Sequence, residues 1–121
     1  MSESANKTFY NRQIEFLASK DVDALIANQY VDDASLLSFT NHIQGADNLR
    51  EYFKQYVEQL GYIKLLSTDQ FAETDDSIFF EATVETAGGI ARVYDAFYLR
   101  DGKIFRHYTG LLSFTPHGQQ N

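Results

Sequence analysis

The chain contains no cysteine and has few positive charges, and both features exclude certain classes of site and partner. Without cysteine, its 121 residues cannot form disulfides, thiolate metal sites or thiol nucleophiles, which fits a reducing compartment. Only 10 Lys and Arg stand against 17 Asp and Glu, and the formal net charge of -7 argues against a phosphate-binding surface. We therefore expect neither nucleic acid nor an anionic membrane as a partner.

Long apolar runs are missing as well. No run approaches membrane-spanning length, and residues 1–6 lack the apolar centre of a signal peptide, so the cytoplasm is the expected location. What the chain does have is an apolar content of 44%, with 10 Phe and 8 Tyr, which is typical of an ordered globular protein. We expect one domain over residues 1–121, with residues 117–121 as a flexible tail.

Helical periodicity is confined to the first half of the chain. The pattern predicts helices over residues 5–19, over a short segment capped by Asp21, and over residues 49–60. Gly61 is expected to end the last of these helices. Residues 34–39 are predicted to form a short strand, and residues 40–45 a loop.

Everything after the third helix has the pattern of β structure. The predicted strands span residues 62–72, 77–86, 90–99 and 103–114. Because the connections are short, consecutive strands should pair as an antiparallel meander. The helices and the meander together predict an α+β domain, with three helices packed on one face of a curved sheet.

The other face of this sheet needs its own cover. Ile90, Tyr94, Ala96 and Tyr98 make that face of one strand rather apolar, and one layer of helices covers only one side of a sheet. A second subunit is the simplest cover. We therefore expect a homodimer through the outer sheet face.

One carboxylate lies among apolar neighbours in the strand over residues 90–99. The period of two places Asp95 on the same face as Val93 and Phe97. A buried carboxylate without a partner is costly. Asp95 is therefore protonated, or paired, or beside a pocket that admits water or a ligand.

The turn between the last two strands decides which residue lies opposite Asp95. A two-residue loop places Tyr108 there, whereas a three-residue loop, which pairs Leu99 with Lys103, places His107 there. We favour the second register, because it collects Val93, Phe97, Leu99, Phe105, Thr109 and Leu111 on one apolar wall. Opposed Cβ atoms lie about 4.5 to 5.5 Å apart, close enough for the carboxylate to orient the imidazole.

An Asp–His pair in such a wall has two interpretations. An Asp that fixes the tautomer of a His makes a general base, and an Asp kept neutral by an apolar site can donate a hydrogen bond to an oxyanion. The alternative is a self-satisfied polar pair that holds the register of a core.

Four segments resemble the NTF2-like superfamily, in particular its SnoaL-like and ketosteroid-isomerase-like branches. They are Asp-Val-Asp-Ala-Leu at 21–25, Asp-Asp-Ala at 32–34, Gly-Ala-Asp-Asn-Leu-Arg-Glu-Tyr-Phe at 45–53, and Asp-Ala-Phe-Tyr-Leu-Arg-Asp-Gly-Lys-Ile at 95–104. The resemblance covers residues 5–114 and implies a cone, or cystatin-like roll. In that fold, three N-terminal helices pack on a strongly curved antiparallel sheet around a deep apolar pocket, and the outer sheet face often forms a dimer.

The resemblance also separates the possible reactions. In the isomerase branch, a carboxylate matching Asp95 binds an oxyanion together with a helix Tyr, and a second Asp shuttles the proton. Those two positions fall at Gln13 and at or beside Ser38, which disfavours steroid-type isomerisation. The epoxide-hydrolase branch uses an Asp-Arg-Asp set, but Arg92 and Asp95 lie on opposite faces. The polyketide-cyclase branch resembles the chain best, because it needs a shaped apolar pocket and one acid/base group, either Asp95 or His107.

Several other side chains could border the pocket. Tyr10 and Gln13 could cap its polar end, His42 could approach its mouth, and Tyr56 could reach it with a hydroxyl. The candidate catalytic residues are Asp95 and His107, and the candidate substrate-binding residues are Tyr10, Gln13, Ser38, His42, Tyr56, Val93, Phe97 and Thr109. The scattered histidines have no metal-ligand spacing, so we expect neither a metal nor a cofactor.

Two classes of function remain open. In the first, the protein is a SnoaL-like enzyme of cyclase or isomerase type, and Asp95 and His107 transfer a proton to or from a small, mostly apolar molecule. In the second, it is a non-catalytic ligand-binding or dimerisation module, and the same pair fixes only the orientation of the ligand.

Overall fold

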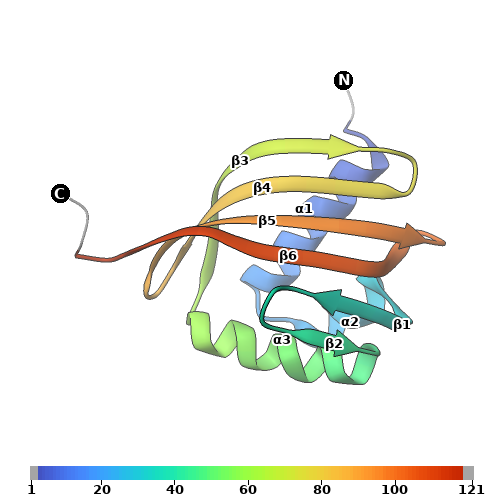
Figure 1. The fold of residues 1–121 in the computed structure, drawn as a ribbon, viewed down its shortest axis with the longest axis horizontal. Helices are drawn as coiled ribbons and strands as arrows, with labels where there is room; N and C mark the ends of the chain where they lie inside the picture. Colours follow the sequence, from blue (N-terminus) through green and yellow to red (C-terminus); the bar gives the residue numbers. More distant parts are fainter. Residues whose placement is uncertain (1–2, 119–121) are drawn as a thin grey trace.

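The computed structural model describes residues 3–118, which form a layer of helices against one twisted sheet (Figure 1). The elements, in order, are α1 (Ala5–Ala18), α2 (Val22–Gln29), β1 (Tyr30–Leu37), β2 (His42–Gln44), α3 (Ala46–Leu60), β3 (Ile63–Glu73), β4 (Ser77–Thr86), β5 (Gly89–Arg100) and β6 (Lys103–Pro116). The sheet has six strands in the order β2-β1-β6-β5-β4-β3. This is the predicted α+β fold.

Local signals in the sequence explain where the helices begin and end. The side chain of Ser4 accepts a hydrogen bond from the backbone of Lys7 and begins α1. Asp21 caps α2 as predicted, by accepting from the backbone N–H of Ala24 at 3.2 Å. Gly61 follows α3 with a φ of 77°, a conformation that suits glycine.

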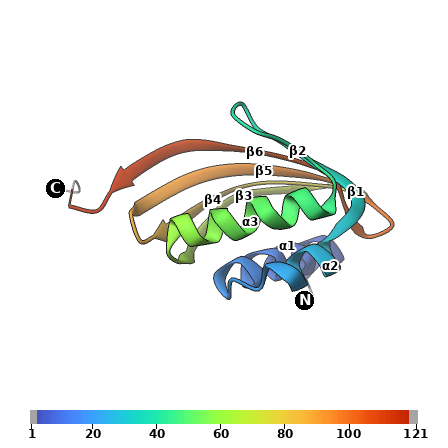
Figure 2. The same ribbon diagram turned by 90° about the horizontal axis from the view of Figure 1, so that it is seen from below.

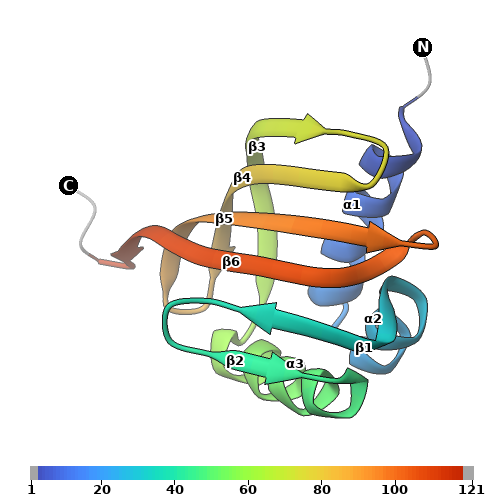
Figure 3. The ribbon, with the colours of Figure 1, turned by 45° about the vertical axis from the view of Figure 1, so that its right-hand side comes forward.

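The meander of β3, β4, β5 and β6 is antiparallel, as predicted. The N-terminal strands differ from the prediction. β1 begins at Tyr30, ahead of the predicted start at Ala34, and residues 42–44 of the predicted loop form β2. β1 pairs in parallel with β6, and the β1–β2 hairpin lies beside β6 (Figure 3). The early start of β1 was not predicted because Asp32 and Asp33 interrupt the alternation of apolar residues. β2 was not predicted because three residues are too few to show an alternation.

The sheet arches over the three helices (Figure 2). The core lies between the two layers and is built from apolar residues of both. Its largest fully buried side chains include Tyr10, Leu25, Leu49, Ile78 and Phe97. None of the helices within residues 3–118 is long and apolar enough to cross a membrane.

The β5–β6 hairpin does not have the predicted three-residue loop. Arg100 pairs with Lys103, and Leu99 pairs with Ile104 rather than with Lys103. The turn therefore consists of residues 101–102, whose φ angles of 54° and 80° suit an Asp-Gly hairpin turn.

A β-bulge then changes the register. Phe105 is the extra residue between two successive pairs, and beyond it His107 pairs with Phe97, and Thr109 pairs with Asp95. The prediction that His107 lies directly opposite Asp95 is therefore wrong. Because a shift of one residue exchanges the faces of a strand, the bulge still returns His107 to the face that carries Asp95.

His117, the first residue of the predicted tail, makes two hydrogen bonds at the turn between β4 and β5. The backbone N–H of His117 donates to the carbonyl of Gly88 at 3.1 Å, and its Nε2 lies 2.9 Å from the carbonyl oxygen of Thr86. Residues 119–121 of this tail lie outside the described residues.

Candidate functional site

A cavity of about 80 Å³ lies between the helices and the concave face of the sheet. A space of this size holds on the order of five water molecules or one small organic molecule. Its apolar wall includes Ile14, Leu17, Leu36, Phe53, Ile63, Phe80, Ala82, Val84, Val93 and Phe97. Its polar lining residues are Gln13, Tyr52, Tyr56, Asp95, His107 and Thr109.

Asp95 and His107 meet in this wall. His107 Nε2 lies 2.7 Å from Asp95 Oδ1, and the two side chains are 5% and 14% exposed, respectively. The pairing of these two residues was expected from the sequence, although it runs diagonally between neighbouring residue pairs of β5 and β6. Asp95 is therefore a partnered carboxylate at the edge of a cavity.

A chain of hydrogen bonds continues behind His107. His107 Nδ1 lies 2.9 Å from the hydroxyl of Tyr30, which in turn lies 2.9 Å from Gln13 Nε2. Gln29 Nε2 lies 3.3 Å from Gln13 Oε1 and 3.1 Å from the backbone carbonyl oxygen of Phe9. We call the side chains of Gln29, Gln13, Tyr30, His107 and Asp95 the polar relay.

Sequence reasoning missed two members of this relay, Gln29 and Tyr30. Gln29 follows Ile26 by three positions and Leu25 by four, so it stands on the apolar side of α2. A buried polar residue on an apolar helix face is a usable signal for a polar network. Tyr30 gives no such signal, because it is the first residue of a strand whose start was not predicted.

Aromatic rings hold the imidazole of His107 in place. The ring of Phe97 meets it edge-on with the centroids 4.7 Å apart. The rings of Tyr30 and Phe53 stack near it at centroid distances of 6.1 and 6.3 Å. This packing leaves the imidazole little freedom to rotate, so its two nitrogens keep their partners.

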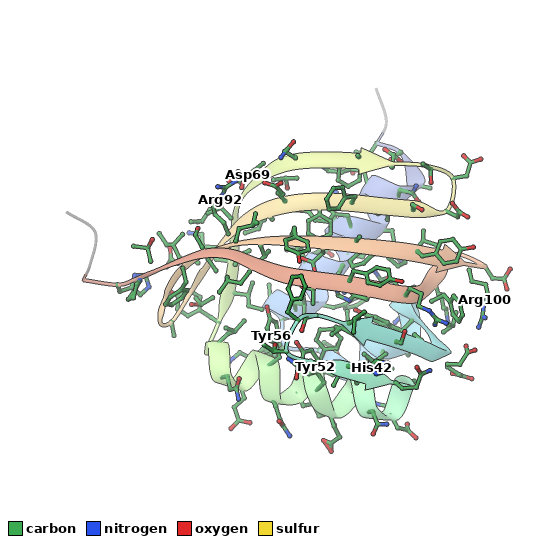
Figure 4. All side chains as sticks on the ribbon, viewed as in Figure 1. His42, Tyr52, Tyr56, Asp69, Arg92 and Arg100 are labelled. Carbon is green, nitrogen blue, oxygen red and sulfur yellow. The ribbon has the colours of Figure 1, made fainter. Side chains whose placement is uncertain are left out.

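Two tyrosines of α3 bring hydroxyl groups to the same cavity. Tyr52 and Tyr56 project from α3 toward the sheet (Figure 4), and their rings stack with centroids 6.0 Å apart. Burial, and to a lesser degree the negative charge of Asp95, raises the pKa of both phenols. Burial also raises the pKa of Tyr30 well above its usual value. All of these hydroxyls are therefore protonated at neutral pH and can donate hydrogen bonds.

The structure brings together most of the predicted site residues. Gln13, Tyr56, Val93, Phe97 and Thr109 line the cavity together with Asp95 and His107.

Three predicted site residues do not line the cavity. Tyr10 is buried in the core, and its hydroxyl lies 2.7 Å from that of Thr68. Ser38 closes the loop after β1 by accepting hydrogen bonds from the backbone of Thr40 and Asn41. His42 is exposed on β2 (Figure 4). Tyr10 is placed by long-range packing that the sequence pattern did not reveal, whereas Ser38 lies in the loop between β1 and β2 and His42 lies on β2, both outside the cavity.

Residues 3–118 contain no group of three or more His, Cys, Asp or Glu side chains that could hold a metal ion.

Solved structures with a similar fold include proteins of very different description. An NTF2-like protein from Anabaena variabilis superposes with a TM-score of 0.77 at 18% identity, covering 100% of this chain and 98% of the other. A putative polyketide cyclase from Sinorhizobium meliloti has a TM-score of 0.74 at 16% identity, covering 89% of this chain and 100% of the other. TerC, co-crystallised with polyporic acid, has a TM-score of 0.74 at 16% identity, covering 89% of this chain and 92% of the other. These likenesses establish the fold.

A comparison with curated proteins gives no match. The family model of the SnoaL-like domain matches residues 10–107, which include both α1 and the Asp95–His107 pair. The chain therefore belongs to the SnoaL-like domain family, and it shares the fold of NTF2-like proteins.

Proposed function

We propose that this protein binds a small, mostly apolar molecule in the cavity and that Asp95 exchanges a proton with it, in a reaction of cyclase or isomerase type. One observation carries the proposal: the carboxylate of Asp95, 14% exposed, lines a cavity whose other walls are mainly apolar. A carboxylate held in such a place can act as a general acid or base. The polyketide cyclase and the polyporic-acid complex among the similar structures support a small organic ligand.

The cavity offers complementary groups for such a reaction. Asp95 can take a proton from a carbon next to a carbonyl, and the hydroxyls of Tyr52 and Tyr56 can donate hydrogen bonds to the carbonyl oxygen. Steroid-type isomerisation stays disfavoured, because Gln13 occupies the helix position and Ser38 lies outside the cavity.

The second candidate function is binding without turnover. The described residues contain no buried side-chain nitrogen or oxygen without a hydrogen-bond partner, so the polar relay is complete without a ligand. A complete network fits an orienting role as well as a chemical one.

Proton exchange at carbon separates the two candidates. We would follow deuterium uptake by cyclohexanone in D₂O by NMR, with wild type, Asp95→Asn and Asp69→Asn, the last altering an exposed carboxylate. The proposal expects wild type to accelerate exchange, Asp95→Asn to lose about 10²- to 10⁴-fold of that acceleration, and Asp69→Asn to retain it. Saturable cyclohexanone binding without accelerated exchange would favour the second candidate, and the absence of both binding and exchange would contradict both candidates.

We also propose that a second copy of the chain covers the outer face of the sheet. Phe79, Ala96, Tyr108 and Leu37 are cross-strand neighbours in one row over β4, β5, β6 and β1, and the three large side chains are about half exposed. Large apolar rows on a protein surface mark association sites, and a two-fold axis lets one such row cover its copy.

Sedimentation of the purified protein tests this association. Wild type is expected to sediment with twice the mass of the chain, and Tyr108→Glu with the mass of one chain. Gln55→Glu adds the same charge at an exposed position of α3 and should leave the mass unchanged. A monomeric wild type would overturn the proposal.

A further inference from the structure

The hydrogen bonds of the polar relay all run in one direction from donor to acceptor, and the backbone carbonyl of Phe9 fixes that direction. The carbonyl oxygen of Phe9 can only accept, so the atom of Gln29 that lies 3.1 Å from it must be the amide nitrogen. That same nitrogen lies 3.3 Å from the side chain of Gln13 and must find an acceptor there, which is Gln13 Oε1. The orientation of both amides is thus fixed by chemistry rather than chosen.

The same direction of hydrogen-bond donation continues from Gln13 to the imidazole of His107. With its oxygen facing Gln29, Gln13 presents its N–H to the hydroxyl oxygen of Tyr30 at 2.9 Å. The hydroxyl oxygen of Tyr30 lies 2.9 Å from His107 Nδ1, and its single hydrogen is donated to that nitrogen. Nδ1 therefore accepts, and the proton of a neutral His107 is on Nε2, where it donates to Asp95 Oδ1 over 2.7 Å.

Other protonation states break a bond in this relay. If Nδ1 carried a proton, it would meet the hydrogen of Tyr30, and that hydrogen would have no other acceptor in the polar relay. Tyr30 is only 2% exposed, so water does not replace the lost partner cheaply. A protonated Asp95 that donates to Nε2 would force a proton onto Nδ1 in a neutral ring, with the same conflict.

We propose that the polar relay holds Asp95 as an ionised hydrogen-bond acceptor, and that the cavity therefore selects neutral ligands with a hydroxyl or an enolisable C–H and rejects carboxylates. His107 is then a positioning residue, because both of its nitrogens are engaged within the protein. Asp95 keeps a second carboxylate oxygen for the ligand, and a ligand carboxylate beside it would meet like charge. The ligand class rests on the proposed function, whereas the direction of the relay stands without it.

The state of the imidazole can be read directly. In ¹⁵N-labelled wild type, the relay predicts an unprotonated Nδ1 and a protonated Nε2 for His107 at neutral pH. Signals of the other two histidines are identified with His42→Asn and His117→Asn. A protonated Nδ1 in wild type would overturn the direction of the relay, and this measurement needs no altered core.

One substitution should reverse the relay. Gln13→Glu replaces the N–H donor with an oxygen, so this position now accepts from both Gln29 and Tyr30. Tyr30 then accepts from His107, and His107 Nδ1 becomes protonated at the same pH. Gln70→Glu adds the same charge at an exposed position of β3 and should leave the His107 signals unchanged. An unprotonated Nδ1 in a folded Gln13→Glu variant would contradict the proposed direction.

Phenol and benzoate test the ligand class, because both carry one ring but only phenol is neutral and donates. We expect wild type to bind phenol at least about tenfold more tightly than benzoate, an advantage of about 1.4 kcal/mol, and Asp95→Asn to lose most of this preference. Equal or tighter benzoate binding would overturn the ligand class. Binding of neither probe, beside an unprotonated Nδ1, would contradict the cavity proposal and leave the direction of the relay intact.

Discussion

Side chains on the two faces of β5 belong to two polar clusters in different surroundings. On the inner face, Asp95 pairs with a buried His107 at the end of the polar relay. On the outer face, Arg92 lies 3.8 Å from Asp69 and 3.2 Å from Glu81, and its side chain is 49% exposed (Figure 4). Carboxylates have hydrogen-bond or ion-pair partners in both clusters, but the inner pair is 5% and 14% exposed and the outer arginine is 49% exposed.

Because of solvent, the loss of one hydrogen-bond partner costs less in the outer cluster than in the inner one. Hydrogen bonds from Thr83 and Ser67 are the main cause that lowers the pKa of Asp69, and water can replace any of these partners. Tyr30 and Gln29 of the inner relay are buried and do not line the cavity, so a donor or acceptor left unpaired beside them is costly. Burial thus explains how a fixed proton position can arise on the inner face.

The largest expected contrast lies between two neighbours on β5. Phe97 is 2% exposed on the inner face, and Tyr98 is 45% exposed on the outer face. We expect Phe97→Ala to lower the free energy of unfolding by about 3 to 5 kcal/mol, and Tyr98→Ala by about 0.5 kcal/mol. Urea unfolding of both variants as monomers at low concentration measures this, and equal losses would remove the distinction between the faces.

The second-largest effect is expected when one hydroxyl group is removed from the polar relay. Tyr30→Phe leaves Gln13 without an acceptor and His107 Nδ1 without a donor, so we expect a loss of about 1 to 3 kcal/mol. Tyr98→Phe removes the same atom from the exposed face and should cost less than about 0.5 kcal/mol. A loss for Tyr30→Phe no larger than for the control would show that water satisfies the relay.

Alkaline pH should destabilise the inner face. The pKa values of Tyr10, Tyr30, Tyr52 and Tyr56 are raised from 10.0, chiefly by burial, so the unfolded chain releases these protons at lower pH than the folded protein does. The stabilisation is complete below pH 10.0 and is lost as the pH rises from there toward the folded-state values. The urea concentration at the midpoint of unfolding should decrease between pH 8 and pH 11, and this decrease should be smaller in Tyr56→Phe. A constant midpoint would contradict the raised values.

The smallest effect is expected on the outer cluster. Arg92→Ala breaks ion pairs with Asp69 and Glu81, but these pairs are exposed, so we expect a change of about 0.5 kcal/mol or less. Salt should shrink this change further. A salt-independent loss above about 2 kcal/mol would mean that the cluster is shielded, for instance by a second copy on this face.

Much of the fold could be predicted because its signals are local. Caps such as Asp21 and Gly61, helical spacing in α3 and short turns between strands act over a few residues. The parallel pairing of β1 with β6 could not be predicted, since it joins strands far apart in the chain. The bulge at Phe105 was missed for a related reason, because pairing across the hairpin decides which residue is left out.

The sequence by itself determined that Asp95 would lie among apolar side chains on one face of a strand, since alternation is a property of the strand alone. Only the tertiary structure decided what that carboxylate can do. Phe9 and Gln13 come from α1, Gln29 from α2 and Tyr30 from β1, and they meet His107 of β6 only when the sheet closes over the helices. A hydrogen-bond direction needs every donor and acceptor in place at once, and folding alone supplies that arrangement.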